Sequence, residues 1–253
     1  MKKETLFVAF TNQKGGVGKS AFTVLMAGYL HYLKGKNVLV VDCDYPQYSI
    51  YTMRERDKQT VDKSKVLKQL MVSQSAEIGR KAYTIITAAP EMAKEEADSF
   101  LDSSSIAYDI VFFDLPGTVN TQGILKSLIN MDYLFVPIIS DRMAMQSSLS
   151  FATTIQDIVK GNKEIPMKGI YLFWNKVDKR VSSDLFNVYN KIMQQLKLNV
   201  LKTVMPDSHR YCKEITATGK PFFRCTLFPP TPKLIKGSNL DILNDEICKI
   251  IKL

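Results

Sequence analysis

The chain has 253 residues, of which 45% are hydrophobic and 10% aromatic, enough apolar side chain for the buried sheet of one α/β domain. No apolar run reaches the roughly 18 residues of a membrane span, and Met1-Lys2-Lys3-Glu4 leads straight into the first expected strand. We therefore expect neither a membrane anchor nor a signal peptide. The four cysteines are far apart and the two histidines isolated, which argues against a zinc site or a disulfide framework and favours a reducing cytoplasm.

The net charge is +9, and much of it falls in the stretch 202–236. That stretch has two acidic residues, Asp207 and Glu214, against seven basic ones: Lys202, Arg210, Lys213, Lys220, Arg224, Lys233 and Lys236. Such clustering is compatible with a surface for a polyanion. A solvated basic face without a partner is the alternative on composition alone.

Strand and helix signals alternate along the whole chain, which predicts a mostly parallel twisted sheet with helices on both faces. The expected strands are 5–10, 37–41, 82–87, 109–113, 133–138, 168–174 and 199–205. The expected helices are 21–33, one within 45–81, 93–101, 121–130, 142–160, 181–196 and about 239–251. The proline-rich stretch 220–238 is expected to be a loop. No linker marks a second domain, so we expect one domain over 1–253 with the last helix docked on it.

The segment Thr11–Ser20 joins the first strand to the first helix, which is the setting of a phosphate-binding loop. Its glycines allow a tight turn whose N–H groups point inward, and the helix start adds the positive end of its dipole. In such a loop Lys19 reaches the β- and γ-phosphates and the Ser20 hydroxyl binds Mg²⁺. A glycine-rich turn that merely closes a strand–helix connection is the structural alternative.

The loop departs from the pattern G-x-x-x-x-G-K-[ST], because Gln13 stands where the first glycine belongs and Lys14 follows it. The sequence K-G-G-V-G-K-S resembles the deviant Walker A motif of the ParA/MinD family of ATPases. This resemblance implies a three-layer P-loop NTPase fold and a site for ATP. The implied phosphate-binding residues are Lys14, Gly15, Gly16, Val17, Gly18, Lys19, Ser20 and Ala21.

Aspartates close two of the predicted strands. Asp114 ends the run Ile110–Phe113 and precedes Pro-Gly, an arrangement typical of the Walker B carboxylate that holds Mg²⁺ together with Ser20. Gly117 is expected to bring its backbone near the γ-phosphate. The segment D-C-D-Y-P-Q at 42–47 is similar to the D-x-D-P-Q switch of the ParA family, with Tyr45 inserted. The resemblance implies that Asp44 aligns the attacking water, the alternative being an Asp-Pro turn without chemistry.

The stretch Trp174–Asp178 contains N-K-x-D, which in GTPases reads guanine through its aspartate. ParA-like proteins also have an asparagine here, and there it binds adenine. The lysine at 14 marks the ATP-using branch, so we expect Asn175 to contact adenine. Val204–Asp207 resembles the family's second adenine-contacting loop, which adds Pro206 and Asp207 to the expected binding residues.

In the family the residue equivalent to Lys14 crosses a dimer interface and contacts the partner's nucleotide, so Lys14, Lys19 and Asp44 are the implied catalytic residues. The resemblance further implies a weak intrinsic ATPase that forms a homodimer with ATP, binds DNA without sequence preference, and is stimulated by a ParB-like or element-encoded activator. Such a protein is cytoplasmic and associates with the nucleoid when ATP is bound. The candidate DNA contacts are Arg210, Lys213, Lys220 and Arg224.

The expected cargo is a plasmid or another mobile element. The D-C-D-Y-P-Q variant resembles ParA-like proteins of conjugative elements in Bacteroides-type bacteria, which implies a role in partition or in regulating transfer. Two alternatives remain open. One is a MinD-like positioning ATPase that binds membranes through its last helix, although Asp241, Asp245 and Glu246 reduce any attraction to anionic lipid. The other is a GTPase of the same superfamily.

Overall fold

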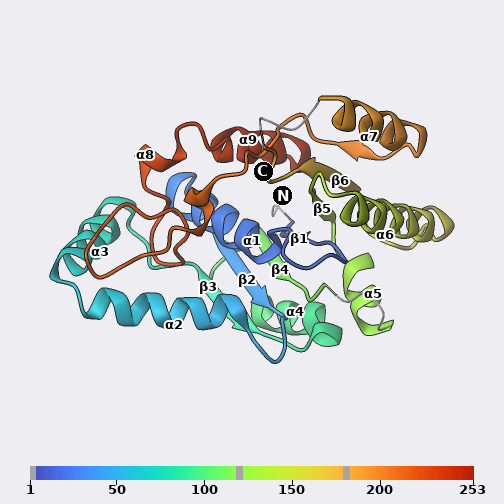
Figure 1. The fold of residues 1–253 in the computed structure, drawn as a ribbon. Helices are drawn as coiled ribbons and strands as arrows, with labels where there is room; N and C mark the ends of the chain where they lie inside the picture. The colour runs from blue at the N-terminus through green and yellow to red at the C-terminus, as the bar shows by residue number, and fades with distance from the viewer. Residues whose placement is uncertain (1–3, 118–121, 179–182) are drawn as a thin grey trace.

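The computed structural model of the chain describes residues 4–117, 122–178 and 183–253, and over these residues seven parallel strands form one sheet (Figure 1). The strand order is β3-β2-β4-β1-β5-β6-β7. The strands are β1 (Leu6–Phe10), β2 (Val38–Asp42), β3 (Thr84–Thr87), β4 (Ile110–Asp114), β5 (Tyr133–Ile138), β6 (Gly169–Trp174) and β7 (Asn199–Val200). The predicted parallel α/β sheet is confirmed.

Helices follow the strands and cover both faces of the sheet (Figure 1). They are α1 (Lys19–Gly28), α2 (Ser49–Asp62), α3 (Lys65–Ile78), α4 (Ala93–Ser103), α5 (Gln122–Ile129), α6 (Arg142–Gly161), α7 (Ser183–Gln195), α8 (Pro232–Ile235) and α9 (Leu240–Ile251). Residue 121 of one predicted helix and residues 181–182 of another lie outside the described residues, as do Met1, Lys2 and Lys3.

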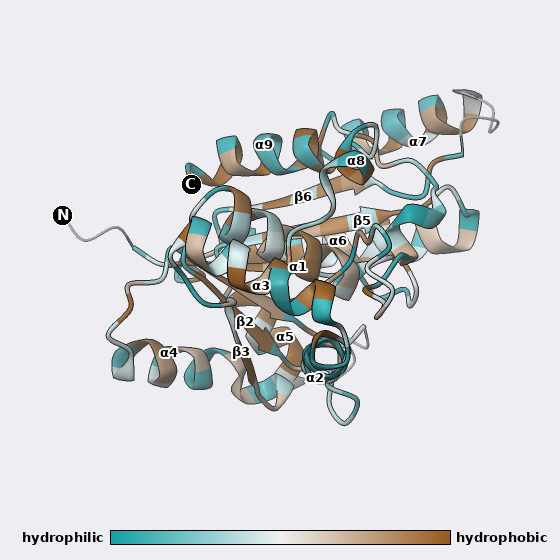
Figure 2. Cartoon of the chain, turned by 90° about the vertical axis from the view of Figure 1, so that its left-hand side faces the viewer, coloured by the Kyte–Doolittle hydropathy of each residue, from teal (hydrophilic) through white to brown (hydrophobic). Residues whose placement is uncertain are grey.

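The central strands are continuous apolar runs, as expected where a parallel strand is buried on both faces. Every residue of β2, β4 and β5 is buried. Side chains of α1 and α9 pack on one face of the sheet and those of α4, α5 and α6 on the other. In Figure 2 the strands are largely hydrophobic, whereas the helices carry hydrophilic residues on their outer sides.

The register of the central strands brings two acidic residues together. β2 and β4 pair so that Val40 lies opposite Phe112 and Asp42 lies opposite Asp114. Both aspartates are therefore at the carboxyl edge of the sheet, where ligands of open α/β folds bind. β1, which lies between β4 and β5, delivers the glycine-rich loop to the same edge.

The prediction of one helix within 45–81 is wrong, since the structure has two helices there, α2 and α3. Hydrophobic periodicity is weak in α2 because its buried face includes Arg54 and Asp57 beside Ile50, Met53 and Val61. The hydrogen-bond partners of these two charged side chains lie in distant parts of the chain, and a local sequence pattern cannot reveal them. Ser64 then starts α3 as its N-cap, and its hydroxyl accepts a hydrogen bond from Leu67 N.

The expected strand 199–205 is only two residues long in the structure, Asn199–Val200. Leu201 N still donates to Leu172 O of β6 at 2.8 Å, but the two N–H groups after it have another acceptor. Glu246 of α9 accepts hydrogen bonds from Lys202 N at 2.7 Å and from Thr203 N at 2.9 Å. The loop 220–238 is confirmed except for the short helix α8. The first helix continues beyond Gly28 as a π-helical segment, Tyr29–Leu33.

The last helix packs by its apolar face. Leu240, Leu243, Ile247 and Ile251 of α9 are buried in the same cluster as side chains of α1. Among the described residues, none of the helices combines the length and hydropathy that crossing a bilayer requires. The arrangement of the whole chain as a single domain stays a prediction.

Candidate functional site

The glycine-rich loop turns between β1 and α1 through two glycines in the left-handed region. The backbone angle φ is +73° at Gly16 and +100° at Gly18, and residues that carry a side chain rarely adopt such values. A Cβ on Gly18 would also lie 3.1 Å from Asn175 Nδ2. Lys19 and Ser20 begin α1 directly after this turn, so the helix N-terminus faces the space above the loop. The geometry is that of an anion-binding helix start.

A buried asparagine fixes the beginning of this loop. Asn12 has no exposed surface, and its side-chain amide donates to Pro137 O and to Ser148 Oγ, both at 2.8 Å. Its carbonyl oxygen accepts the backbone N–H of Lys14 at 3.0 Å. Asn12 thus ties the loop to β5 and α6. Sequence analysis missed this role, although the position next to the glycine-rich motif is a local signal.

The two lysines of the loop have different surroundings. Lys19 is partly buried, and this burial lowers the pKa of its ammonium, while the negative charges of Asp114 and Asp44 act in the opposite direction. Its Nζ lies 3.5 Å from Lys14 O. The side chain of Lys14, in contrast, is exposed. Lys19 therefore faces the site of its own chain, and Lys14 extends from the loop into solvent.

Asp114 is buried, and neither of its carboxylate oxygens has a hydrogen-bond partner among the described residues. Burial raises its pKa to about 7, although Ser20 and Lys19 favour the ionised form. An unpartnered buried carboxylate beside the Ser20 hydroxyl is a donor set of hard oxygen atoms, which Mg²⁺ prefers. The residues present therefore fit the metal ion that the sequence predicts.

The neighbouring aspartate Asp42 is used differently. Its Oδ2 accepts the backbone N–H groups of Ile50 and Tyr51, both at 2.9 Å, and its Oδ1 accepts that of Asp44 at 3.2 Å. It therefore caps the first turn of α2 from β2. Asp44 itself is half-buried, and its charge acts on both Lys19 and Asp114. The predicted switch aspartate thus lies at the same edge as the glycine-rich loop.

Gly117 approaches the loop closely. A Cβ at this position would lie 3.0 Å from Lys19 Nζ, 3.3 Å from Gln13 O and 3.4 Å from Asn12 O. Two of these three atoms are backbone atoms, which cannot move aside as a flexible side chain can. The absence of a side chain at 117 therefore allows the segment after β4 to contact the glycine-rich loop.

A cavity of about 410 Å³ opens above this loop and continues along α1. Of the predicted binding residues, it is lined by Gly16, Gly18, Lys19, Ser20, Ala21, Asn175 and Asp207. Lys14, Gly15, Val17, Gly117 and Pro206 are not among its lining residues. The residues that sequence analysis did not assign to it are Phe22, Leu25, Lys176, Ser208, His209, Tyr211, Cys212 and Arg224.

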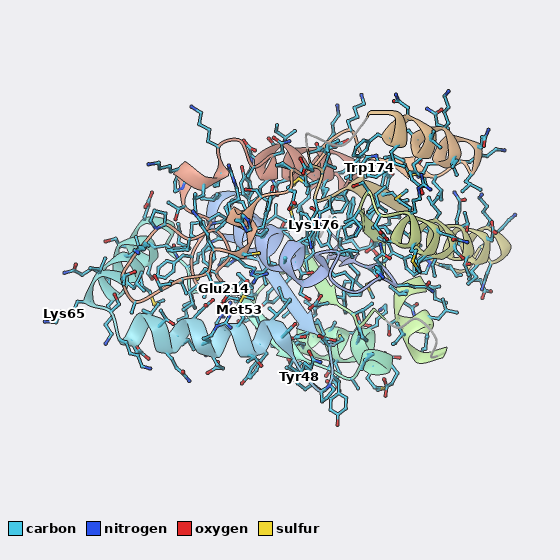
Figure 3. All side chains as sticks on the ribbon, in the orientation of Figure 1. Tyr48, Met53, Lys65, Trp174, Lys176 and Glu214 are labelled. Atoms are coloured by element: carbon cyan, nitrogen blue, oxygen red, sulfur yellow. The ribbon has the colours of Figure 1, made fainter. Side chains whose placement is uncertain are left out.

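The wall opposite the glycine-rich loop is formed by the segments after β6 and β7. Val177 N donates to Met205 O at 3.0 Å, and Asp207 N donates to Val177 O at 2.9 Å, so the two segments run together. Asn175 donates to Val17 O and Lys176 to Gly16 O, both at 2.8 Å. Lys176 and Trp174, at the end of β6, are labelled in Figure 3. The N-K pair thus holds the carbonyl groups of the glycine-rich loop.

The predicted DNA contacts separate into two groups. Arg210 donates to Leu234 O and Lys236 O, both at 2.9 Å, and Arg224 lines the cavity above α1. Lys213 and Lys220 instead line a second cavity of about 540 Å³, together with Lys233. All three lysines are exposed. The DNA-binding role itself stays a prediction.

The geometry agrees with comparison against known protein families. Residues 8–222 match the family described as the CobQ/CobB/MinD/ParA nucleotide binding domain. The chain belongs to this family. Its members of the ParA/MinD type are P-loop ATPases, so the resemblance expected from K-G-G-V-G-K-S is confirmed.

Individual relatives are distant but cover most of the chain. The sporulation initiation inhibitor protein Soj of Bacillus subtilis is 25% identical over 234 residues, which are 85% of this chain and 88% of Soj. The ATP complex of a Cyanothece McdA variant has a TM-score of 0.61 at 15% identity, with 98% of this chain and 97% of that chain covered. A putative plasmid partition protein from Borrelia burgdorferi bound to AMPPNP has a TM-score of 0.59 at 16% identity, with 98% of each chain covered. These two likenesses show the fold.

Proposed function

We propose that the protein is a ParA-like ATPase that binds ATP with Mg²⁺, closes as a homodimer around two nucleotides, and hydrolyses ATP to ADP and phosphate. One observation carries the proposal. Lys19, Asp44 and Asp114 converge on the glycine-rich loop from three different elements, while the side chain of Lys14 extends from that loop into solvent. A loop that only joined a strand to a helix would need neither the charges around Lys19 nor an unpartnered buried carboxylate.

In this proposal the N–H groups of Gly15 to Ser20 and the Lys19 ammonium bind the β- and γ-phosphates. Asp44 orients the water that attacks the γ-phosphorus. Ser20 and Asp114 would hold Mg²⁺, which offsets the negative charge of the phosphates when bound. Gly117 brings its backbone to the γ-phosphate side, so that loss of this phosphate releases its contact with the loop.

Lys14 completes the site of the partner subunit. Its ammonium supplies positive charge where negative charge develops during phosphoryl transfer, as an arginine finger does. The exposed side chain supports this role, because Lys14 is free to reach across an interface while Asn12 holds its backbone in place. Neither subunit alone then has a complete site, so intrinsic activity is weak and hydrolysis depends on dimerisation.

We propose adenine rather than guanine as the base. A guanine reader of the N-K-x-D type uses its aspartate, and Asp178 is not among the residues that line the cavity, whereas Asn175 and Asp207 are. A competition experiment between ATP and GTP, monitored by thermal shift, distinguishes adenine from guanine as the preferred base. Tighter binding of GTP would favour the GTPase alternative.

For the polyanion surface we propose the lysines of the second cavity, Lys213, Lys220 and Lys233, which are exposed and gathered around one hollow. Non-specific DNA binding through such phosphate contacts is steeply salt-dependent. The logarithm of the DNA affinity is expected to fall with log salt concentration, and the slope to shrink by about 0.9 for each lysine replaced by alanine. An unchanged slope in the triple variant would remove these lysines from the surface.

The partner is a ParB-like or element-encoded activator, and the cargo is a plasmid or another mobile element. Support comes from the similarly folded Borrelia protein, which is described as a putative plasmid partition protein. A MinD-like membrane role is less well supported, because the apolar face of α9 is buried against α1 and the sheet. Liposome binding that depends on the last dozen residues would favour that alternative.

The direct test is ATP turnover of the wild type with and without DNA, combined with the molecular mass in the presence of a non-hydrolysable ATP analogue. The proposal expects a monomer without nucleotide, a dimer with the analogue, and slow turnover that rises with DNA and the activator. ATP binding without any turnover under all of these conditions would instead indicate a non-catalytic scaffold.

A further inference from the structure

Arg224 is a cationic side chain of the cavity that the proposed phosphate chemistry does not use. It lies in the segment between the last strand and α8, and it lines the cavity together with Phe22, Leu25 and Cys212. Its backbone N–H donates to Lys213 O at 3.0 Å, which fixes the chain at this point. The residue therefore reaches the site from a part of the sequence far from the glycine-rich loop.

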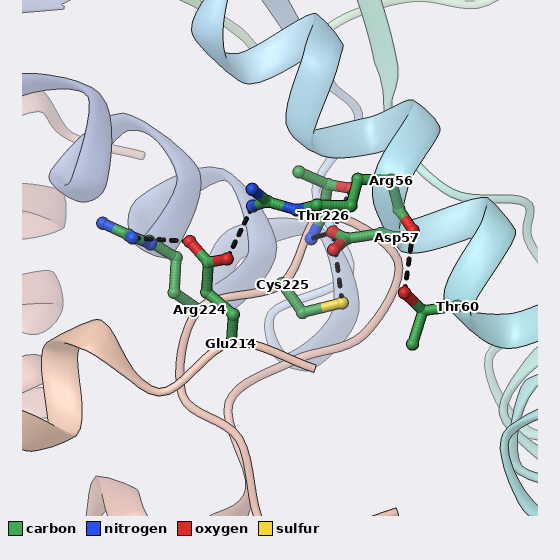
Figure 4. Close-up of polar contacts among 7 residues, drawn as sticks. All are labelled: Arg56, Asp57, Thr60, Glu214, Arg224, Cys225 and Thr226. Carbon is green, nitrogen blue, oxygen red and sulfur yellow. Dashed lines mark hydrogen bonds and ion pairs between the residues drawn. The ribbon is translucent and has the colours of Figure 1, made fainter. Parts of the chain in front are cut away.

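The guanidinium of Arg224 is held by an acid that is shared with helix α2. Its Nη2 donates to Glu214 Oε1 at 2.6 Å, and Glu214 Oε2 accepts from Arg56 Nη2 at 2.6 Å (Figure 4). The Nε of Arg224 is buried and has no partner among the described residues. Glu214 therefore fixes the plane of the guanidinium at the point where Arg224 lines the cavity.

The segment that carries Arg224 is fastened to α2 by a second, buried set of contacts (Figure 4). Thr226 donates to Asp57 Oδ2 through both its backbone N–H and its hydroxyl, at 2.8 Å each. Arg54 donates from Nε to Thr226 Oγ1 at 2.9 Å. Asp57, Arg54 and Thr226 are all buried, and hydrogen bonds are stronger in such low-dielectric surroundings than in water. Arg224 therefore cannot shift along the cavity without disturbing α2.

We infer that Arg224 contacts the nucleoside half of the bound nucleotide, and that Glu214 and Arg56 act as positioning residues for it. This inference rests on the proposal that the cavity holds a nucleotide. In the proposed site the loop N–H groups and Lys19 already bind the phosphates. Arg224 lines the cavity together with Phe22, Leu25 and Cys212. A planar guanidinium whose charge is balanced by Glu214 suits an uncharged aromatic base or the adjoining ribose, by packing its flat face against them.

The inference is tested by comparing ATP, ADP and inorganic tripolyphosphate as ligands in titration calorimetry. Arg224→Ala is expected to lower the affinity for ATP and the affinity for ADP by the same factor, about tenfold, and to leave the affinity for tripolyphosphate unchanged. Arg224→Gln, which keeps most of the side-chain volume, should lose affinity in the same pattern. Retained tripolyphosphate binding shows in either variant that the glycine-rich loop is folded.

The positioning role is tested on α2, outside the cavity. Arg56→Ala is expected to lower the affinities for ATP and ADP about twofold to threefold without changing the affinity for tripolyphosphate. Arg56→Lys should restore most of the lost affinity. Lys58→Ala is the matched control, because Lys58 pairs with Glu55 of the same helix and should change nothing.

Two outcomes would overturn the inference. One is unchanged ATP affinity in Arg224→Ala. The other is a loss that is larger for ATP than for ADP or extends to tripolyphosphate, since either pattern makes Arg224 a phosphate contact. If the wild type binds none of the three ligands, the proposed function fails instead, so the two failures are distinguishable.

Discussion

The two ends of the cavity differ in how the chain builds them. The end proposed for the phosphates, the phosphate end, is formed by one short loop and the start of α1, and this loop is supported by Asn12 and contacted by the segment at Gly117. The end proposed for the nucleoside, the nucleoside end, is lined by Asn175, Asp207 and Arg224, residues far apart in the sequence. The first end therefore requires a local backbone conformation, whereas the second requires several loops to fold against each other.

This difference indicates at which end of the cavity a substitution should change function most. Changes at the phosphate end act on the charge and geometry of the reaction and are expected to be severe. Changes at the nucleoside end act on single contacts of a composite wall and are expected to be mild. The following predictions test that ranking.

The largest effect is expected for Lys19→Ala. Removal of the ammonium that faces the phosphates should lower ATP turnover about a thousandfold, as loss of a preorganised charge-stabilising donor does. The measurement is steady-state phosphate release at saturating DNA. Turnover within tenfold of the wild type would show that the phosphate end is not organised around this lysine.

Asp114→Asn is expected to change how stability depends on pH. Burial raises the pKa of Asp114 to about 7 in the folded chain, against 3.8 for an unperturbed carboxyl. The folded state thus keeps a proton that the unfolded chain has lost, and stability falls as the pH rises from about 4 to 7. Without metal or nucleotide, the free energy of unfolding at pH 8 should be higher for the variant than for the wild type by up to about 4 kcal/mol.

Urea unfolding at pH 5 and pH 8 measures this difference. Some decline with pH remains in the variant, because burial also raises the pKa of Asp42 and of Asp57. An equal decline in both proteins would show that Asp114 is ionised throughout. The variant should also bind ATP with less benefit from Mg²⁺.

Gly117→Ala is expected to have an intermediate effect. The added methyl group would press on Gln13 O and Asn12 O, at 3.3 and 3.4 Å, and displace the loop by a few tenths of an ångström. Turnover should fall about tenfold while ATP affinity changes less. Gly161→Ala serves as the control, because a Cβ there meets nothing within 4 Å. Equal turnover in both variants would contradict the close approach.

The smallest effect is expected for Lys176→Ala, in the segment after β6 that also supplies Asn175 to the proposed nucleoside end. Its Nζ contributes one exposed hydrogen bond to Gly16 O. Loss of one such bond should weaken ATP binding about threefold. A hundredfold loss in a fluorescent-nucleotide titration would invert the ranking of the two ends and make this wall as critical as the loop.

The same contrast explains what the sequence reveals. The glycine-rich loop, Asp114 at the end of β4, Asp44 just after β2, and the parallel sheet of an alternating α/β chain depend on local patterns and are predictable. Helix α2 was missed as a separate element because Arg54 and Asp57, which belong to its buried face, find their partner Thr226 far along the chain. Arg224 resembles a surface cation in the sequence because its partner Glu214, which it shares with Arg56, becomes visible only in the fold.

In the proposed dimer, Lys14 completes the site of the partner subunit. Two variants, Lys14→Ala and Asp44→Ala, test this by ATP turnover measured separately and after mixing. Each alone should be nearly inactive. In a mixed dimer the Lys14→Ala subunit keeps its own Asp44 and receives Lys14 from its partner, so an equal mixture should recover about a quarter of wild-type turnover. A mixture no more active than its two components would contradict the exchange of Lys14 between subunits.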